Sequence, residues 1–149
     1  MQAELHLVDA FTHAPFRGNV AGVCIPDGPA EDAWMQQVAS ELKHSETAFL
    51  FPEGSGWRLR WFTPAKEVEL CGHATLAAAS VLYETGRVPE GRQVVFETLS
   101  GKLTTWREGD WIHMDFPAEP PKTSMAIPGL GQALGVEPLY TGRNRFDVL

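Results

Sequence analysis

Residues 70–86 read LCGHATLAAASVLYETG and form the most distinctive stretch of this 149-residue sequence. From about His73 to Thr85 the segment is rich in alanine and leucine, and Gly86 stands where a helix commonly ends. Apolar side chains fall on almost every side of this predicted helix, whereas a helix at the protein surface carries a charged face. We therefore expect the helix to be buried at the centre of the domain.

The regions on either side of this helix predict a sheet with many strands. Strands are expected over 5–11, 20–25, 47–51, 57–62, 94–98, 103–107 and 111–116, with short strands at 139–141 and from 145 to 149. Further helices are expected over 30–43 and 129–135. Many strands with few crossover helices argue against a parallel βαβ sheet. The prediction is an α+β fold in which an antiparallel sheet curls around the buried helix.

The composition is that of one globular domain, with 44% hydrophobic and 21% charged residues. The formal net charge of −7 disfavours a nucleic-acid partner, because phosphate backbones repel an acidic surface. No apolar run is long enough to predict a membrane span, and the first residues lack the features of a signal peptide. The two cysteines, Cys24 and Cys71, are therefore expected as reduced thiols in the cytoplasm.

Glu46 is the first candidate for chemistry. It lies in the stretch SETAFL, residues 45–50, where a loop that follows a helix enters an apolar strand. A carboxylate in such a place is partly desolvated, and burial raises a carboxyl pKa toward the range that suits proton transfer at neutral pH. A solvated glutamate at a strand end fits the same position, so the residue alone leaves both interpretations open.

The start of the central helix, at Cys71, Gly72 and His73, is the second candidate. Free backbone N–H groups at a helix start, beside a glycine that permits close approach, make an anion site where a substrate carboxylate could bind. His73 would stand at the mouth of this site, and the helix start would lower the pKa of the Cys71 thiol. The alternative is a glycine turn with a capping histidine and a small buried cysteine.

Other signals are weaker. The pair Gly18-Asn19 fits either a functional loop or a simple turn. No cysteine or histidine pair has C-x-x-C, H-x-x-x-H or H-E-x-x-H spacing, and Cys71 with His73 alone would chelate poorly, so no metal site is predicted. No G-x-G-x-x-G or P-loop motif occurs, so no nucleotide cofactor is predicted.

Six segments taken together resemble a known family. They read DAF at 9–11, FRGNVAGV at 16–23, SETAF at 45–49, RWFTP at 60–64, ELCGHATLA at 69–77 and TGRN at 141–144. In order and spacing they are similar to the phenazine-biosynthesis-like isomerases, whose fold is that of diaminopimelate epimerase. The pair Ser-Glu-Thr and Cys-Gly-His-Ala-Thr is specific to that family when both occur in this order.

The resemblance implies a cofactor-free isomerase that shifts a proton on a small carboxylate-bearing metabolite. The family's acid/base glutamate falls on Glu46. Its substrate-holding residues fall on Gly72 and His73, with Ala74 beside them, and its active-site asparagine falls on Asn19. The resemblance also implies a homodimer for the complete enzyme.

The chain departs from the family pattern in two respects. Val20 stands where the family usually has proline after Gly-Asn. The family has two similar lobes, so residues 1–149 correspond to the N-terminal lobe, and a second lobe with an aspartate opposite Glu46 is expected beyond Leu149. The isolated chain is therefore expected to be inactive and prone to associate.

Two alternative functions stay open. Epimerases and racemases with this fold use a cysteine from each lobe, and Cys71 stands at the position of the first one. This keeps a thiol-dependent amino-acid epimerase or racemase as one alternative. The other is a non-catalytic lobe that binds a ligand or a partner.

Overall fold

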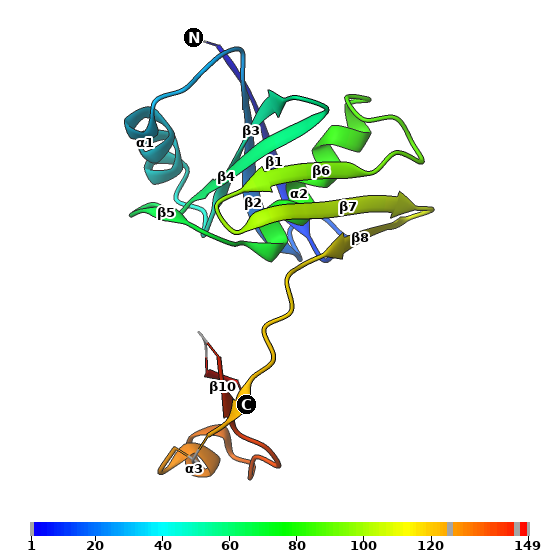
Figure 1. Ribbon diagram of the computed structural model, residues 1–149. Coiled ribbons are helices and arrows are strands. Elements are labelled where there is room, and N and C mark those ends of the chain that lie inside the picture. Colours follow the sequence, from blue (N-terminus) through cyan, green and yellow to red (C-terminus); the bar gives the residue numbers. More distant parts are fainter. Residues whose placement is uncertain (1, 125–126, 145–146, 149) are drawn as a thin grey trace. The chain divides into compact units, whose positions relative to one another are not determined.

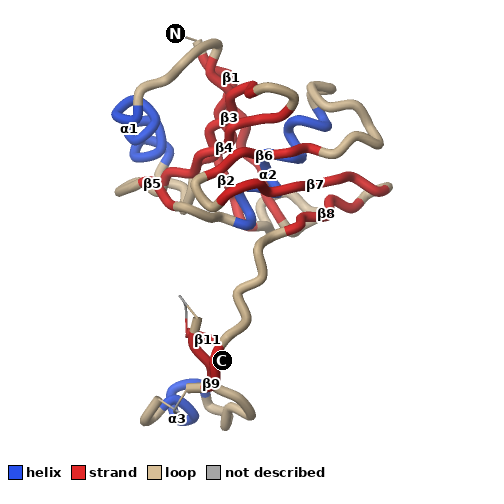
Figure 2. Tube along the Cα trace, in the orientation of Figure 1, coloured by secondary structure: helices blue, strands red, loops and turns tan. Residues whose placement is uncertain are grey.

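The computed structural model describes residues 2–124, 127–144 and 147–148. Two compact units make up the chain, Met1–Phe116 and Pro117–Leu149. The first holds a curled sheet with two helices, and the second holds short strands and a short helix (Figures 1 and 2). Within the described ranges no helix is both long and apolar enough to cross a membrane.

One sheet of eight strands dominates the first unit, counted over the described residues (Figure 1). The strands are β1 (Ala3–Ala10), β2 (Asn19–Pro26), β3 (Thr47–Glu53), β4 (Gly56–Phe62), β5 (Glu67–Val68), β6 (Val94–Thr98), β7 (Gly101–Glu108) and β8 (Trp111–Asp115). Their order is β1-β2-β3-β4-β6-β7-β8, and β5 pairs with β4. The seven long strands predicted from the sequence are confirmed, whereas β5 was not predicted.

The sheet is mixed, which corrects the expectation of an antiparallel one. β2 pairs with β3 in parallel, and so does β4 with β6, while the remaining neighbours are antiparallel. The physical reason lies in the connections. Helices α1 (Asp32–Leu42) and α2 (Gly72–Glu84) each stand between the two strands of a parallel pair and return the chain to the starting end of the sheet.

Helix α2 is buried inside the curve of the sheet, as its apolar pattern predicted (Figure 2). Its buried residues are Ala74, Thr75, Ala77, Ala78, Ala79, Val81, Leu82 and Tyr83. The helix contacts β1, β2, β3 and β8, and its alanines let the strands approach closely. Large side chains from the strands, including Trp61, Leu59 and Phe96, complete this core.

Helix α1 packs in a separate apolar cluster. Met35 and Ala39 are fully buried there, together with Phe49 and Phe62 from β3 and β4. The helix stops at Lys43, which adopts a left-handed conformation with φ of 58° and donates its N–H to the carbonyl oxygen of Ala39. This reversal sends the chain toward β3 within a few residues and so fixes the segment that carries Glu46.

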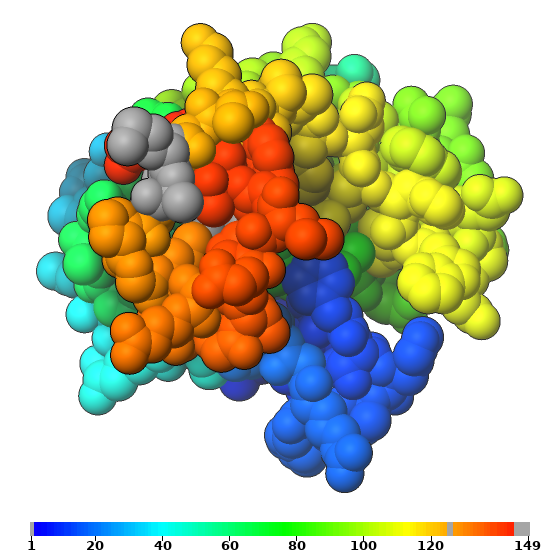
Figure 3. Space-filling view, turned by 90° about the horizontal axis from the view of Figure 1, so that it is seen from below, coloured from blue at the N-terminus to red at the C-terminus, as the bar shows by residue number. Residues whose placement is uncertain are grey.

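A groove remains over α2, where the sheet does not close on itself. Its volume is about 500 Å³, and it is lined by Val8, Asp9, Ala10, Phe11, Thr12, His13, Leu76, Ala77, Ser80, Asp110, Trp111, Ile112 and Met114. Figure 3 shows this hollow between the loop after β1, in blue, and the start of β8, in yellow. Trp111 is 69% exposed and Phe11 is 68% exposed, so the rim of the groove is apolar.

The second unit contains β9 (Lys122–Thr123), α3 (Leu130–Leu134), β10 (Gly142–Arg143) and β11 (Asp147–Val148), with β10 between the other two strands. The helix predicted over 129–135 is confirmed. The strand predicted at 139–141 is wrong, because the pairing with β9 begins at Gly142. Of the strand predicted over 145–149, Asp147–Val148 is confirmed, while 145, 146 and 149 lie outside the described residues.

Candidate active site

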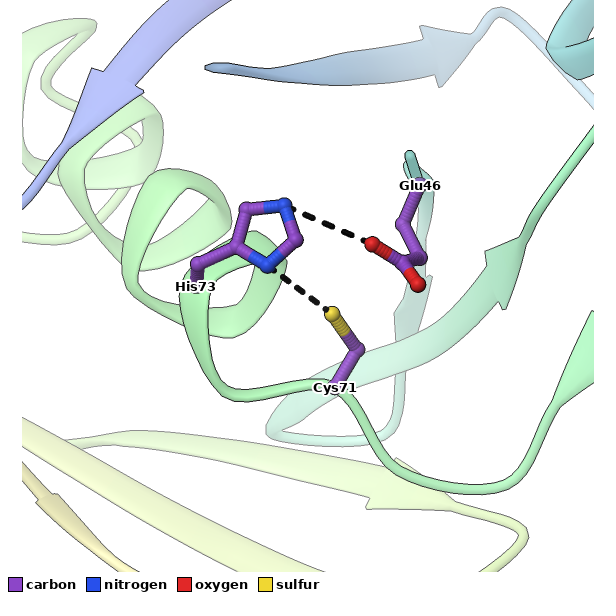
Figure 4. A group of neighbouring side chains, drawn as sticks. All are labelled: Glu46, Cys71 and His73. Carbon is purple, nitrogen blue, oxygen red and sulfur yellow. Dashed lines mark hydrogen bonds and ion pairs between the residues drawn. The ribbon is translucent and has the colours of Figure 1, made fainter. Parts of the chain in front are cut away.

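Three reactive side chains predicted from separate motifs converge at the start of α2 (Figure 4). Oε2 of Glu46 lies 3.5 Å from Nε2 of His73. Sγ of Cys71 lies 3.4 Å from Nδ1 of the same ring. His73 therefore lies between the carboxylate and the thiol, with one ring nitrogen directed at each.

The loop before β3 places Glu46. The N–H of Gly22 in β2 donates to the carbonyl oxygen of Glu46 at 3.3 Å, and Thr47, the next residue, is fully buried. The backbone on both sides of the carboxylate is thus held by the parallel pair β2–β3. Its side chain keeps 21% of its surface exposed, so it is neither sealed in the core nor fully solvated.

The turn into α2 places the other two side chains. Cys71 is extended, and its carbonyl oxygen accepts hydrogen bonds from the N–H of Thr75 at 3.2 Å and from the hydroxyl of Thr75 at 2.6 Å. Since this is the first bond of the helix, the N–H groups of Gly72, His73 and Ala74 precede the helical ladder. These groups are the donors on which the predicted anion site depends.

The fold does not require a glycine at position 72. Its φ lies outside the left-handed region, and a Cβ added there would meet no atom within 4 Å. A larger residue would therefore fit the backbone and would project into open space before the helix start. The absence of packing against this position leaves room for a ligand to approach the backbone.

The pKa of the Cys71 thiol contradicts the expectation from the sequence. Burial raises its pKa to about 11, the N–H of Ala74 acts in the opposite direction, and the charge of Glu46 raises it further. The predicted net lowering of the pKa is wrong, because Cys71 is only 8% exposed as a residue and lies near the Glu46 carboxylate, and these two effects outweigh the N–H groups of the helix start. At neutral pH this group is a thiol and not a thiolate.

The protonated thiol has a consequence for the histidine. If the S–H of Cys71 donates to Nδ1 of His73, the hydrogen of a neutral ring lies on Nε2; the contact itself fits either direction of the bond. Nε2 can thus donate to Glu46, or to Oγ of Ser45 at 3.3 Å. Ser45 was quoted from the sequence as part of a motif but was given no role. Its position directly before Glu46 was the feature that could have identified it as a site residue.

Asn19 and Ala74, the remaining two predicted site residues, do not contribute side chains to this cluster. Asn19 is exposed and opens β2, and because Gly22 pairs in parallel with Thr47, it lies toward the same end of the sheet as Glu46. The Ala74 side chain is fully buried, so only its backbone could serve a ligand. Neither residue belongs to the cluster of three.

The cluster also offers metal-binding atoms. One carboxylate oxygen, one sulfur and one ring nitrogen lie within 4.8 Å of one another, from Glu46, Cys71 and His73. The sequence spacing considered only Cys71 with His73, two residues apart. Glu46 joins them through the fold, from a position that no local spacing rule covers.

Comparisons with known proteins find one family. A family model described as phenazine biosynthesis-like protein matches residues 8–129. An uncharacterized isomerase of Halalkalibacterium halodurans is 51% identical over 150 residues, which cover 100% of this chain and 57% of that protein.

Solved structures agree on the fold. A phenazine biosynthesis protein of Enterococcus faecalis matches with a TM-score of 0.89 at 37% identity, over 99% of this chain and 56% of that chain. A predicted epimerase of Pseudomonas aeruginosa matches with a TM-score of 0.63 at 27% identity, over 78% of this chain and 45% of that chain. The sequence-based expectation of a diaminopimelate epimerase-like fold is confirmed, and the chain spans about half the length of these relatives.

Proposed function

The chain belongs to the phenazine biosynthesis-like protein family, and from this premise we propose that it carries the acid/base side of a cofactor-independent isomerase. The substrate class is a small metabolite that bears a carboxylate. The single observation that carries the proposal is the pairing of Glu46 with His73 at the start of a buried helix, beside a glycine at which an added Cβ would meet no atom within 4 Å.

Glu46 moves the proton. Its carboxylate takes a proton from one carbon of the substrate, and the electron pair of that C–H bond delocalises into the conjugated system or the carboxylate of the substrate. The protonated side chain then returns the proton to a second carbon, so no atom is gained or lost. The partial exposure of Glu46 supports this role, because the group is reachable from outside while its backbone is fixed.

His73 holds the carboxylate of Glu46 and the substrate in place. Nε2 donates toward Glu46 at 3.5 Å, a distance that a bound substrate or a small rotation of the ring would shorten into a hydrogen bond. In this proposal Cys71 acts through His73: its S–H donates to Nδ1, which leaves the ring hydrogen on Nε2. Cys71 is thus a positioning residue in this proposal.

The start of α2 binds the substrate carboxylate. The N–H of Gly72 and the positive end of the helix dipole favour a negative charge, while the N–H groups of His73 and Ala74 also interact with the Cys71 sulfur. The open space before Gly72 supports this assignment, because a ligand oxygen can reach the backbone without displacing a side chain. Asn19, at the same end of the sheet, is proposed as a further contact.

One observation favours the thiol alternative, namely the contact of Cys71 with a histidine. A thiol-dependent racemase needs a thiolate to abstract the proton, and the raised pKa of about 11 opposes that form at neutral pH. The acid/base role of Glu46 therefore remains the better proposal.

The proposed mechanism also needs a second lobe of the protein. A closed, water-poor cavity protects the deprotonated substrate from side reactions until Glu46 delivers a proton to the second carbon. Since the chain spans about half the length of its relatives, we propose that a further lobe closes the site and carries an aspartate opposite Glu46. We also propose that the complete enzyme is a homodimer.

The test is exchange of substrate hydrogen with solvent. The complete protein is incubated in D₂O with a panel of small carboxylates, and deuterium uptake is followed by mass spectrometry. Uptake should disappear in Glu46→Gln and persist in Glu41→Gln, a matched control at an exposed position on α1. Unchanged uptake in Glu46→Gln would reject the proposal.

A further inference from the structure

The acid/base cluster combines three different donor types from two distant parts of the chain. Glu46 comes from the loop before β3, while Cys71 and His73 come from the turn into α2. One oxygen, one sulfur and one nitrogen lie within 4.8 Å of one another. This is a donor set without a second carboxylate, so it differs in chemistry from the acidic clusters common on protein surfaces.

Carboxylate, thiolate and imidazole are the donors that zinc prefers. Zn²⁺ binds sulfur at about 2.3 Å and nitrogen or oxygen at about 2.0–2.2 Å, so a tetrahedral ion separates its donors by about 3.3–3.6 Å. Two contacts in the cluster, 3.4 Å for Sγ–Nδ1 and 3.5 Å for Oε2–Nε2, already fall near this range. Only one ring nitrogen can bind the same ion, so the three donors, which lie within 4.8 Å of one another, would close around it by a movement of the His73 and Glu46 side chains.

The site is held in place before any ion binds. The side chain of His73 is 10% exposed, that of Glu46 is 21% exposed, and Cys71 is 8% exposed as a whole residue. The backbone of Cys71 is held by Thr75 and that of Glu46 by Gly22. A zinc ion with three protein ligands keeps a fourth position for water or a small anion, and Gly72, between two of the ligands, packs against no atom within 4 Å of an added Cβ.

We propose that Glu46, Cys71 and His73 form a binding site for a zinc-type divalent cation, and that the ion inhibits the enzyme by occupying its acid/base group. Binding replaces the S–H bond of Cys71 by a metal–sulfur bond and releases one proton to the buffer, since a coordinating thiol is deprotonated outright. No electron is transferred. The binding part of the inference stands alone, whereas the inhibition part rests on the proposed function of Glu46.

Cobalt is the probe for the binding test, because Co²⁺ substitutes for Zn²⁺ and is coloured. The reduced 149-residue chain is titrated with Co²⁺, and absorption is recorded for thiolate-to-cobalt charge transfer. We expect one ion per chain, with displacement by Zn²⁺ that bleaches the band. Cys71→Ala should abolish the charge-transfer band, and Glu46→Gln or His73→Asn should weaken binding by more than roughly tenfold.

Cys24→Ala is the matched control. Cys24 is the other cysteine of the chain, buried in the cluster with Met35 and Phe49, and its loss should leave cobalt binding unchanged. Thermal melting of each variant by circular dichroism separates loss of the site from loss of the fold. A charge-transfer band that survives in Cys71→Ala, or the absence of stoichiometric binding to the folded wild-type chain, would overturn the site.

Activity separates the two proposals. Zn²⁺ should inhibit deuterium uptake by the complete protein, and a chelator should restore it. If the chain binds no metal but Glu46→Gln loses activity, the zinc site is rejected and the isomerase proposal is supported. If the chain binds metal but Glu46→Gln keeps normal activity, the isomerase mechanism is rejected and the metal site is supported. If bound Zn²⁺ leaves the activity unchanged, the proposed inhibition is rejected.

Discussion

Gly72→Val should separate ligand binding from folding. The structure predicts little effect on stability, because an added Cβ at Gly72 meets no atom within 4 Å and the backbone is not in the left-handed region. Valine is also a better helix residue than glycine. The expected change in the free energy of unfolding is within about 0.5 kcal/mol.

Ligand affinity should respond far more strongly. The isopropyl group of the valine would occupy the open space at Gly72, beside the N–H that we propose as a donor to the anion. A hydrogen bond to a charged group contributes about 1.5–3 kcal/mol, and the helix dipole adds about 0.3–1 kcal/mol. Loss of one such contact with part of the dipole interaction costs about 2–3 kcal/mol, which weakens anion binding by about 30- to 160-fold.

The assay is a nuclear magnetic resonance titration of the ¹⁵N-labelled chain with inorganic phosphate and with a small dicarboxylate. The amide signals of residues 72–74 should shift in the wild type and stay still in Gly72→Val, while Gly72→Ala should be intermediate. Gly28→Val is the matched control, since a Cβ at Gly28 also meets nothing within 4 Å and that residue lies in the turn after β2. Undiminished anion affinity in Gly72→Val would refute the reasoning.

Four other outcomes are expected. Glu46→Gln in the complete enzyme should lower kcat by roughly 10²–10⁴-fold, and a near-normal kcat would contradict its role. Cys71→Ser keeps an O–H donor to His73 and should retain most activity, whereas a dead serine variant, with substrate protecting the wild-type thiol from alkylation, would favour the thiol mechanism. The pKa of both Cys24 and Cys71 is raised to about 11, so the unfolded chain loses these protons first, and chemical denaturation should show stability falling from pH 9 toward pH 11. A flat pH profile would argue against both shifts. Phe16 is 95% exposed, and its N–H donates to the carboxylate of Asp9, which lines the groove over α2. The isolated chain should therefore associate in analytical ultracentrifugation, and Phe16→Ser should reduce the association; a monomeric wild type would contradict this.

The sequence by itself determined the elements and their burial. The apolar pattern from His73 to Thr85 predicted a buried helix, and α2 is buried. Apolar runs, alternating patterns and the turns between them predicted the seven long strands, because the apolar pattern along a segment records which of its faces meets the core. Glu46 and His73 were also chosen from the sequence as candidate site residues, through their local positions and through the resemblance of the segments around them.

Only the tertiary structure decided how distant segments meet. The parallel pairs depend on where α1 and α2 return the chain, and no local pattern encodes that direction. The contact between Glu46 and His73 depends on the register of β3 beside β2 and on the path into α2, so their 27-residue separation carried no spacing signal. The pKa of Cys71 was misjudged for the same reason: the helix start is visible in the sequence, whereas the burial and the facing carboxylate that outweigh it exist only once the chain has folded.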